Sequence, residues 1–247
     1  MDKALVLPSL DPSAQAVFLD YDGTLVEIAP TPEEARADPE LLLLLQLLQE
    51  RLDGALAIVT GRPVGDIDAL LHPLRLTVAA LHGLAVRRRD GSTMVAPVAT
   101  ALLDPVRDAF SAFAADHSGT RVEDKGLSVA LHFRGAAGAA DAADRLAQAL
   151  AEASEGALRL QRGKMVVELL PAGTDKGTGI AGLMDTVPFA GRRPVFVGDD
   201  VTDEAGFAAV NRLGGMSVKV GDGSTAAARR LPDVAAVRAW LGQGSFS

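Results

Sequence analysis

Two aspartates and a threonine that follow a short apolar run are the residues of this chain best suited to chemistry. The run Val17-Phe18-Leu19 leads directly into Asp20-Tyr21-Asp22-Gly23-Thr24. Two carboxylates this close repel each other unless a cation or a shared proton relieves the repulsion. A buried strand that ends here would deliver them to the edge of a sheet, where open α/β folds bind their ligands. The alternative is a polar turn with Asp22-Gly23 at its centre.

Polar groups also follow three other apolar runs of the chain. They are Thr60-Gly61-Arg62, His82-Gly83 and Gly198-Asp199-Asp200, the last with Asp203 shortly after it. A further candidate, Lys176, stands at the expected start of a helix. Because the carboxyl ends of parallel strands meet at one edge of a sheet, we expect these side chains to cluster there.

The predicted cluster has the chemistry of a magnesium and phosphate site. Carboxylate oxygens without histidine or cysteine form a hard donor set that suits Mg²⁺. Thr60 and Lys176 can donate to phosphate oxygens. Taken singly, each residue also fits a structural role: Thr60 as a strand-end cap, Lys176 as a solvated lysine and Asp203 as a helix N-cap.

The elements that must position these residues alternate between apolar runs and helix signals. This alternation predicts a parallel sheet with both faces covered. Strands are expected at 17–19, 55–59, 77–81, 194–197 and 216–220. Helices are expected around 41–48 and at 64–71, 176–184, 203–210, 226–231 and 234–241.

The pattern changes in the middle of the chain. Hairpins are expected at 86–95 and 158–169, a half-buried strand at 127–134, and helices at 99–115 and 139–153. Such a run predicts a mostly antiparallel α+β layer. We therefore predict an α/β fold whose Rossmann-like parallel-sheet core comprises residues 1–84 and 172–247, with an α+β domain inserted at 85–171. The basic run Arg87-Arg88-Arg89 is expected to face solvent.

Composition narrows the classes of partner. The chain has 247 residues, 48% of them apolar, a net charge of -8 and a sequence pI of about 5.0. This acidic balance argues against nucleic-acid binding. There is no cysteine, which excludes disulfides and thiolate metal sites. The leucine run at 41–48 is far shorter than the ~20 residues of a membrane span. With no signal-like segment at the start, we expect a cytoplasmic monomer with no membrane partner.

Four of these candidate segments together resemble the motifs of the haloacid dehalogenase superfamily of phosphohydrolases. The resemblance covers the whole core, from Asp20-Tyr21-Asp22-Gly23-Thr24 through Thr60 and Lys176 to Gly198-Asp199-Asp200 with Asp203. It implies that Asp20 attacks phosphorus and that Asp22 is the general acid and base. It also implies Mg²⁺ held by Asp20, the Asp22 main-chain carbonyl and Asp199. Asp200 and Asp203 would help, directly or through water and Lys176.

Within that superfamily, the inserted region resembles trehalose-6-phosphate phosphatases. The similar segments run from Arg121 to Arg134 and from Gly163 to Gly177. The resemblance implies a haloacid dehalogenase-like core whose inserted cap selects a sugar phosphate. Carboxylates accept from sugar hydroxyls, and Lys or Arg donates to sugar oxygens. The implied substrate-binding residues are Glu123, Lys125, Arg134, Lys164 and Glu168 in the cap and Gly61, Arg62, His82 and Gly83 in the core.

Other functions remain open at this point. A sucrose-phosphate or mannosyl-phosphoglycerate phosphatase would keep the chemistry and change the sugar. A signalling receiver domain also combines aspartates, a threonine and a lysine, but it lacks the Asp-x-Asp-Gly-Thr order and is much shorter. A sugar-phosphate sensor without catalysis could share the fold, since fold does not fix function. Leu81 departs from the family, which often carries a small polar residue there.

Overall fold

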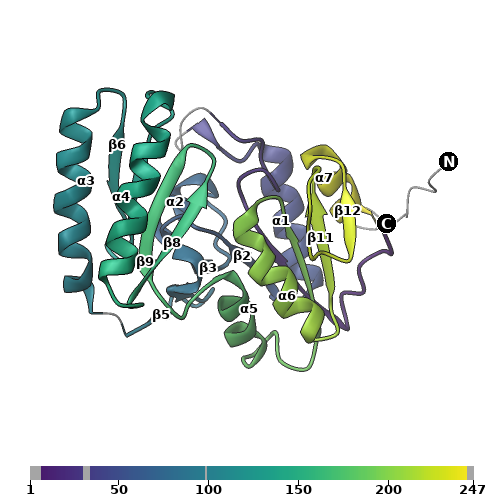
Figure 1. The fold of residues 1–247 in the computed structure, drawn as a ribbon. Helices are drawn as coiled ribbons and strands as arrows, with labels where there is room; N and C mark the ends of the chain where they lie inside the picture. Colours follow the sequence, from purple (N-terminus) through teal and green to yellow (C-terminus); the bar gives the residue numbers. More distant parts are fainter. Residues whose placement is uncertain (1–6, 30–33, 98, 244–247) are drawn as a thin grey trace. The chain divides into compact units, whose positions relative to one another are not determined.

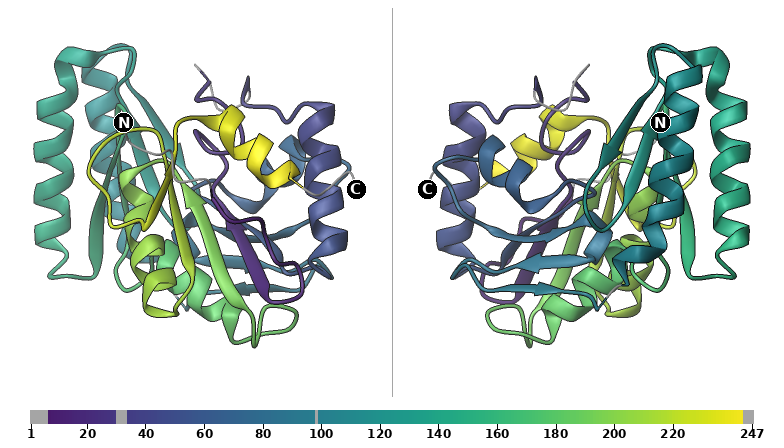
Figure 2. Two further views of the ribbon diagram at one scale, coloured as in Figure 1. Left: turned by 90° about the vertical axis from the view of Figure 1, so that its right-hand side faces the viewer. Right: turned by 90° about the vertical axis from the view of Figure 1, so that its left-hand side faces the viewer.

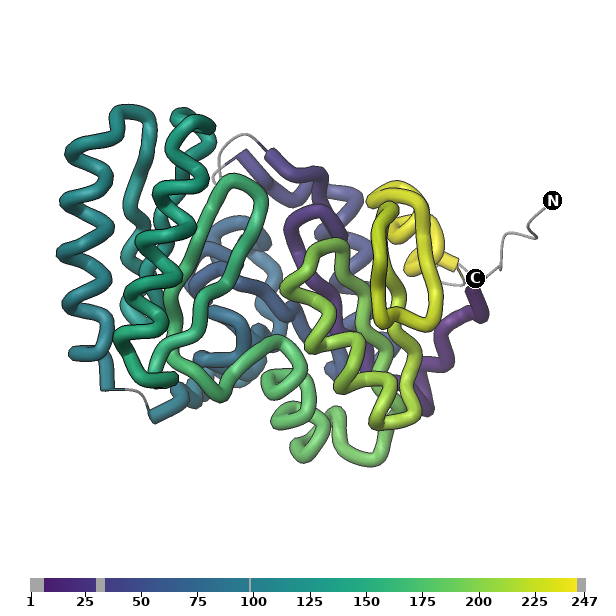
Figure 3. Tube along the Cα trace, viewed as in Figure 1, coloured from purple at the N-terminus to yellow at the C-terminus, as the bar shows by residue number. Residues whose placement is uncertain are grey.

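The chain folds as two compact units in a computed structural model that describes residues 7–29, 34–97 and 99–243. The first unit comprises residues 1–95 and 175–247, and the second comprises residues 96–174. Figure 3 follows the chain as it leaves the first unit after Val95 and returns to it at Asp175. Both boundaries lie further along the chain than the predicted divisions after residues 84 and 171.

The first unit is built on an eight-stranded sheet with the order β12-β11-β10-β1-β2-β3-β4-β5. The strands from β12 to β3 are parallel, and β4 and β5 continue the sheet antiparallel. Their bounds are β1 (Gln15–Leu19), β2 (Leu56–Val59), β3 (Thr77–Ala80), β4 (Ala85–Arg87), β5 (Thr93–Val95), β10 (Arg193–Gly198), β11 (Met216–Val220) and β12 (Arg229–Leu231). The predicted α/β class with a parallel sheet is confirmed.

Helices cover both faces of this sheet. Figure 2 shows α1 and α7 on one face and α5 and α6 on the other. The helices are α1 (Pro39–Arg51), α2 (Val64–Leu70), α5 (Lys176–Met184), α6 (Glu204–Arg212) and α7 (Val234–Gly242), with short 3₁₀ turns η2 (Leu81–Gly83) and η5 (Val201–Asp203). Because both faces are covered, the central strands are mainly apolar; β2, for example, is buried over its whole length.

The second unit is a four-stranded antiparallel sheet with helices on one face (Figure 1). The sheet order is β6-β7-β9-β8. Its elements are α3 (Asp104–Asp116), β6 (Arg121–Asp124), β7 (Val129–His132), α4 (Ala140–Ala153), β8 (Leu158–Gly163) and β9 (Val166–Pro171), with 3₁₀ turns η3 (Thr100–Leu103) and η4 (Ala137–Ala139). Phe110 of α3 packs in one apolar cluster with Leu131 and Leu169 of the sheet. Side chains alternate along a strand, so Glu123, Ala130 and Glu168, which are aligned across β6, β7 and β9, lie on the other face.

Two expectations about local structure were wrong. Residues 226–231 do not form a helix, because Arg229–Leu231 pairs in parallel with β11 as the edge strand β12. Three alanines favour a helix there, but sheet pairing overrides local propensity. Arg87 does not face solvent, since it is 2% exposed and its Nη2 lies 2.5 Å from Asp68 Oδ1.

The hairpin at 86–95 formed as expected but belongs to the core sheet. Strand β4 pairs with β3, with Ala80 opposite Ala85, and β5 pairs with β4. The sequence contains the hairpin signal but does not say which sheet the hairpin joins. This pairing explains why the first boundary between the units lies after Val95.

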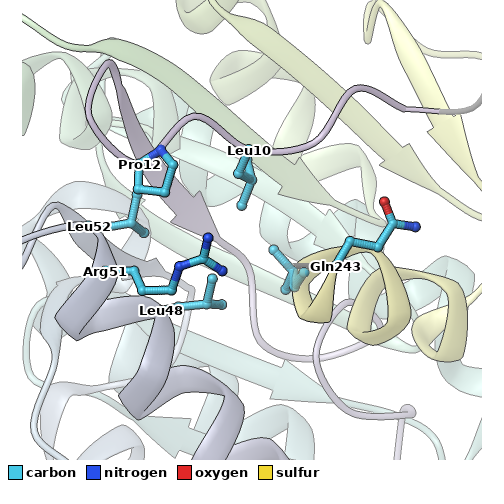
Figure 4. A pocket seen from close by; sticks show the side chains of 7 residues that line it. Leu10, Pro12, Leu48, Arg51, Leu52 and Gln243 are labelled. Carbon is cyan, nitrogen blue, oxygen red and sulfur yellow. The ribbon is translucent and has the colours of Figure 1, made fainter. Parts of the chain in front are cut away.

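A small depression of the first unit is lined mainly by apolar side chains. Figure 4 shows its lining residues, which are Leu10, Pro12, Leu48, Arg51, Leu52, Leu241 and Gln243. Pro12 precedes β1 and Leu52 precedes β2, so the depression lies at the amino ends of the strands. The candidate residues that follow the strands of this unit lie at the opposite ends, and none of the candidate residues lines the depression. Among the helices of the described residues, none is long and apolar enough to cross a membrane.

Candidate active site

The first acidic pair stands where β1 leaves the sheet. Asp20 still pairs with the neighbouring strand, since its N–H donates to Val197 O at 2.9 Å. The chain then turns at Gly23, which has a φ of 77°. The buried Tyr21 hydroxyl donates to Ala35 O at 2.7 Å and anchors this turn. Asp20 itself is 5% exposed, and Thr24 Oγ1 lies 3.4 Å from its Oδ2. The turn therefore holds Asp20 inside the protein.

Lys176 connects this turn to the other acidic segment. Its Nζ lies 2.7 Å from Asp20 Oδ1 and 2.7 Å from Asp203 Oδ1. The Lys176 side chain is 3% exposed, which excludes the alternative that Lys176 is a solvated surface lysine. Lys176 is the first residue of α5, as predicted, and Asp175 caps that helix by accepting from Thr178 N at 2.7 Å. The cap fixes the N-terminus of α5 and therefore the backbone position of Lys176.

Helix α5 lies unusually close to its neighbours. A Cβ atom at Gly177 would overlap the carbonyl of Ala205 in α6. A Cβ atom at Gly83 would overlap the carbonyl of Asp175, and Gly83 lies beside Gly179. Glycine in a helix costs stability, about 1 kcal/mol relative to alanine. Here it allows the close packing that brings Lys176 to Asp20. Contact between Gly83 and substrate remains a prediction.

Asp203 and Asp199 complete the acidic cluster. Asp203 is fully buried, and its Oδ2 accepts from the main-chain N–H groups of Asp199 and Asp200 at 3.0 and 2.9 Å. Although Asp203 stands at the N-cap of α6, it makes no side-chain capping bond to that helix. A Cβ atom at Gly23 would overlap the Asp199 carboxylate, so this carboxylate lies against the β1 turn.

The three carboxylates can hold a cation. One oxygen from each of Asp20, Asp199 and Asp203 lies within 4.8 Å of the others. The donor set is all oxygen, as Mg²⁺ prefers. Asp200 is not in this group; its Oδ1 accepts from Val201 N at 2.7 Å and caps η5. The Asp22 carboxylate is also outside the group, which leaves its main-chain carbonyl as the predicted ligand.

The electrostatics of the cluster favour a cation. Burial raises the pKa of Asp20 well above its usual range; the nearby Asp203 and Asp199 carboxylates add to this, while the Lys176 ammonium opposes it. Burial lowers the pKa of Lys176, but Asp20 and Asp203 outweigh it and the net shift is upward. The three carboxylates outnumber the one ammonium among them, and a divalent cation would offset the excess negative charge.

The Asp22 carboxylate faces Arg62. The Arg62 Nε lies 2.6 Å from Asp22 Oδ2, and Nη2 lies 2.6 Å from Oδ1. The guanidinium carbon lies 5.8 Å from the centre of the Tyr21 ring. Arg62 was predicted to bind substrate, and the structure adds that it binds the candidate acid and base.

The turn after β2 carries Thr60 and is bonded to the turn after β3. Thr60 is 1% exposed, and its hydroxyl accepts from Arg62 N at 3.1 Å. His82 N donates to Thr60 O at 3.0 Å, and His82 has the strained φ of 55°. Gly61 leaves no room for a Cβ atom because the His82 ring lies against it. The two turns therefore hold each other in place beside the cluster.

Five predicted sugar-binding residues belong to the second unit. Lys125 Nζ lies 3.2 Å from Glu168 Oε2, and Ser128 Oγ lies 2.5 Å from Glu168 Oε1. His132 Nε2 lies 2.7 Å from Glu123 Oε2. This hydrogen bond lowers the pKa of Glu123. Glu123 and Glu168 thus lie in hydrogen-bonded pairs on the sheet face away from the helices.

Arg134 and Lys164 lie at one end of the same sheet. Both are exposed. Phe133 N donates to Met165 O at 3.0 Å, which places the segments that carry Arg134 and Lys164 side by side. Lys125 lies toward the other end, beyond the pair Asp124 and Val129. The predicted set therefore spreads along the polar face of the sheet.

Four side chains that support the candidate residues were not singled out from the sequence. Tyr21 anchors the first turn, Ser128 and His132 contact the two cap glutamates, and the Lys219 ammonium donates to the main-chain oxygen of Asp199. Lys219 could have been noticed in the sequence, because it is a charged residue within the strand expected at 216–220. The others look like ordinary strand or turn residues.

Comparison with known proteins gives one consistent result. Residues 18–234 match the trehalose-phosphatase family. The chain is 45% identical over 226 residues to trehalose-6-phosphate phosphatase of Escherichia coli (strain K12), with 92% of this chain and 85% of that relative covered. It is 42% identical over 220 residues to the probable trehalose-phosphate phosphatase of Sinorhizobium fredii, with 86% and 80% covered.

Solved structures agree with the sequence comparison. The crystal structure of a trehalose-6-phosphate phosphatase related protein superposes with a TM-score of 0.78 at 31% identity, over 93% of this chain and 96% of that one. The C-terminal domain of C. albicans trehalose-6-phosphate phosphatase superposes with a TM-score of 0.83 at 21% identity, over 97% of this chain and 98% of that one. The second likeness supports the fold alone.

Proposed function

We propose that this chain, which belongs to the trehalose-phosphatase family, hydrolyses trehalose 6-phosphate to trehalose and inorganic phosphate. The observation that carries the proposal is the buried bond network from Asp20 through Lys176 to Asp203. All three residues lie inside the stretch that matches the family. An ordinary core would not bury this many charges.

The first step makes a covalent intermediate on Asp20. A carboxylate oxygen of Asp20 attacks phosphorus as the bond from phosphorus to the sugar oxygen breaks. Asp22 in its acid form gives a proton to that leaving oxygen, so that trehalose departs as the neutral alcohol. Lys176 supports the step because its ammonium orients Asp20 and offsets the repulsion between carboxylate and phosphate.

The second step releases phosphate. Water attacks the phosphorus of the aspartyl-phosphate, and Asp22, now a carboxylate, takes the proton of that water. The acyl phosphate bond breaks, and Asp20 returns to its starting state. The same residue serves as acid and then as base, as microscopic reversibility requires.

The cluster would hold Mg²⁺ through Asp20, Asp199 and the main-chain carbonyl of Asp22. The bound ion would neutralise the carboxylates and draw negative charge from the phosphoryl oxygens. Both oxygens of Asp203 already accept hydrogen bonds, so we assign it to holding Lys176 and the Asp199 turn. Asp200 caps η5 and would contact the ion through water.

Thr60 and the cap glutamates divide substrate recognition between phosphate and sugar. The buried Thr60 hydroxyl would donate to a phosphoryl oxygen. In the second unit, Glu123 and Glu168 would accept from sugar hydroxyls, and Lys125, Arg134 and Lys164 would donate to sugar oxygens. Substrate contact is also proposed for four residues of the core, Gly61, Arg62, His82 and Gly83.

A phosphate-release panel tests the proposal. Purified protein with Mg²⁺ is given trehalose 6-phosphate, glucose 6-phosphate, sucrose 6-phosphate and mannosyl-phosphoglycerate at equal concentrations. We expect kcat/KM for trehalose 6-phosphate to exceed each of the others at least about 100-fold, which corresponds to about 2.7 kcal/mol. Equal rates on glucose 6-phosphate would refute the specific assignment. A preference for another disaccharide phosphate would keep the chemistry and change the sugar.

Two further predictions concern the cellular location and the oligomeric state of the protein. A cytoplasmic location is expected for an enzyme of sugar metabolism, and the chain is expected to act as a monomer. Light scattering of the purified protein tests the second expectation.

A further inference from the structure

A buried lysine outside the proposed chemistry contacts the metal-binding turn. Lys219 lies in β11 between Val218 and Val220 and is 6% exposed. Its Nζ donates to the main-chain oxygen of Asp199 and, at 2.7 Å, to that of Val220. A buried ammonium is costly unless hydrogen bonds compensate it. The burial of Lys219 in this strand therefore indicates a specific role.

The position of Lys219 along the sheet points to that role. Lys219 is opposite Gly198, the last residue of β10. Its ammonium therefore stands where the chain leaves the sheet and enters the acidic turn. Ser217, two residues earlier on the same strand, bonds to Asn211 of α6 instead. Of these two side chains, only that of Lys219 bonds to the Asp199 carbonyl.

Asp199 is held from three directions. Its N–H donates to Asp203 Oδ2 at 3.0 Å, its carbonyl accepts from Lys219, and its carboxylate lies against Gly23. The contact at the Asp199 N–H depends on the buried Asp203 carboxylate, and the contact at the Asp199 carbonyl depends on the buried Lys219 ammonium. Removing either would free one end of the peptide that carries the Asp199 side chain.

We propose that Lys219 is a positioning residue that fixes the Asp199 turn and so adapts the acidic site to Mg²⁺. The inference rests on the proposed function, since it concerns the same metal site. Mg²⁺ requires near-octahedral oxygen ligands at about 2.0–2.1 Å, whereas Ca²⁺ accepts irregular sets at about 2.3–2.6 Å. A ligand turn held at both its N–H and its carbonyl favours the smaller and stricter ion.

The effect of Lys219 on the position of the turn and the effect of its charge on metal binding can be separated by comparing Mg²⁺ with Ca²⁺. Removing the ammonium takes one positive charge from the neighbourhood of the site. That change alone would strengthen Mg²⁺ and Ca²⁺ binding alike, because the ions carry equal charge. A loosened turn would instead weaken Mg²⁺ binding relative to Ca²⁺ binding. The ratio of the two dissociation constants therefore reports on position and is insensitive to charge.

The experiment is a calorimetric titration of metal-free Lys219→Met with MgCl₂ and, separately, with CaCl₂. We expect the ratio of the Mg²⁺ to the Ca²⁺ dissociation constant to rise at least about fivefold over the unsubstituted protein. An unchanged ratio overturns the inference, even if both affinities shift together. Ser217→Ala is the matched control on the same strand, and its ratio is expected to stay unchanged.

A second variant guards against misfolding. If circular dichroism shows that Lys219→Met does not fold, Lys219→Gln replaces it, because its amide can still donate to one carbonyl. We expect Lys219→Gln to change the ratio by about two- to threefold in the same direction. No change in a folded Lys219→Gln overturns the inference as well. If the unsubstituted protein hydrolyses trehalose 6-phosphate but binds both ions equally well, the inference fails while the proposed function stands.

Discussion

Arg62 binds both oxygens of Asp22, with distances of 2.6 Å from Nε to Oδ2 and 2.6 Å from Nη2 to Oδ1. A two-point contact of this kind fixes the plane of the carboxylate as well as its position. Asp22 is the proposed proton donor, so its orientation decides whether the leaving oxygen receives a proton in time. The pair is partly buried, with the Arg62 side chain 14% exposed.

Replacing Arg62 should therefore affect substrates according to their leaving group. General acid catalysis is worth about 10²–10⁴ in rate, and p-nitrophenolate leaves without needing a proton. We expect Arg62→Gln to lower kcat for trehalose 6-phosphate about 100-fold and for p-nitrophenyl phosphate less than about fivefold. Steady-state kinetics on both substrates checks this. The control is Arg162→Gln, which breaks an exposed pair with Asp144. Equal losses on both substrates would assign Arg62 to phosphate binding.

Asp20→Asn should abolish turnover and stabilise the metal-free protein. The amide cannot form the covalent intermediate, and it also removes a buried charge whose pKa is raised by burial and by Asp203 and Asp199. We expect a melting temperature in EDTA about 2–4 °C higher, the shift that ~1 kcal/mol produces in a protein of this size. Scanning calorimetry and phosphate release measure the two effects, with the exposed Asp108→Asn as control. Retention of most of the rate would exclude Asp20 as nucleophile.

Lys176 should matter for folding as well as for catalysis. Lys176→Met leaves Asp20 and Asp203 buried without their cation, a change that typically costs about 3–5 kcal/mol. Adding Asp203→Asn removes one of the stranded charges. We expect the double variant to recover at least about 1 kcal/mol of that loss while staying inactive. Urea unfolding of the two single variants and the double variant completes the cycle, and strict additivity would argue against the bond.

The stability that Mg²⁺ confers should increase with pH. Because burial raises the pKa of Asp20 in the folded protein above its unfolded value, the metal-free fold loses stability as pH rises from about 3.9 through the folded pKa. A cation bound at Asp20 offsets this loss of stability. At lower pH, protons compete with the cation for the Asp20 carboxylate. We expect the Mg²⁺-induced rise in melting temperature to be larger at about pH 8 than at about pH 5.5.

Thermal scans with Mg²⁺ or EDTA at several pH values measure this effect. Asp20→Asn is the control, since its response should be smaller and nearly independent of pH. A Mg²⁺ effect that falls with rising pH would contradict the assignment of Asp20 to the metal site.

His132 should act on sugar binding without acting on phosphoryl transfer. Its hydrogen bond lowers the pKa of Glu123 and keeps that carboxylate available to sugar hydroxyls. We expect His132→Ala to raise KM for trehalose 6-phosphate about tenfold, as loss of about 1.4 kcal/mol would, with kcat within about twofold. KM for p-nitrophenyl phosphate, which lacks the disaccharide, should not change. His72→Ala, at an exposed histidine, is the matched control.

The sequence was most informative where chemistry and local pattern coincide. Asp20, Lys176 and Asp203 were each expected at a strand or helix end, and the structure brings all three together through bonds of 2.7 Å. Helix α5 also begins and ends at the predicted residues. These positions were predictable because apolar strands must be buried and their carboxyl ends must share an edge.

The failures share one physical cause, which is pairing between different elements of the fold. Strand β12 and the attachment of the 85–95 hairpin to the core sheet depend on which strand edge is open. Local propensity carries no such information. The partners of Asp22 and Glu123 were hidden for the same reason, since Arg62 and His132 come from other elements. Fold topology had to be known before those contacts could be seen.

Glycines at the start of α5 link the reactivity of the protein to completion of its fold. A helix that opens with Lys176-Gly177-Thr178-Gly179 has little tendency to form by itself. It becomes stable once the backbone of α6 and the segment around Gly83 close upon it. Until then the ammonium has no fixed place opposite the nucleophile. An incompletely folded chain would thus be inactive. A newly synthesised molecule would become active only when its final packing is complete.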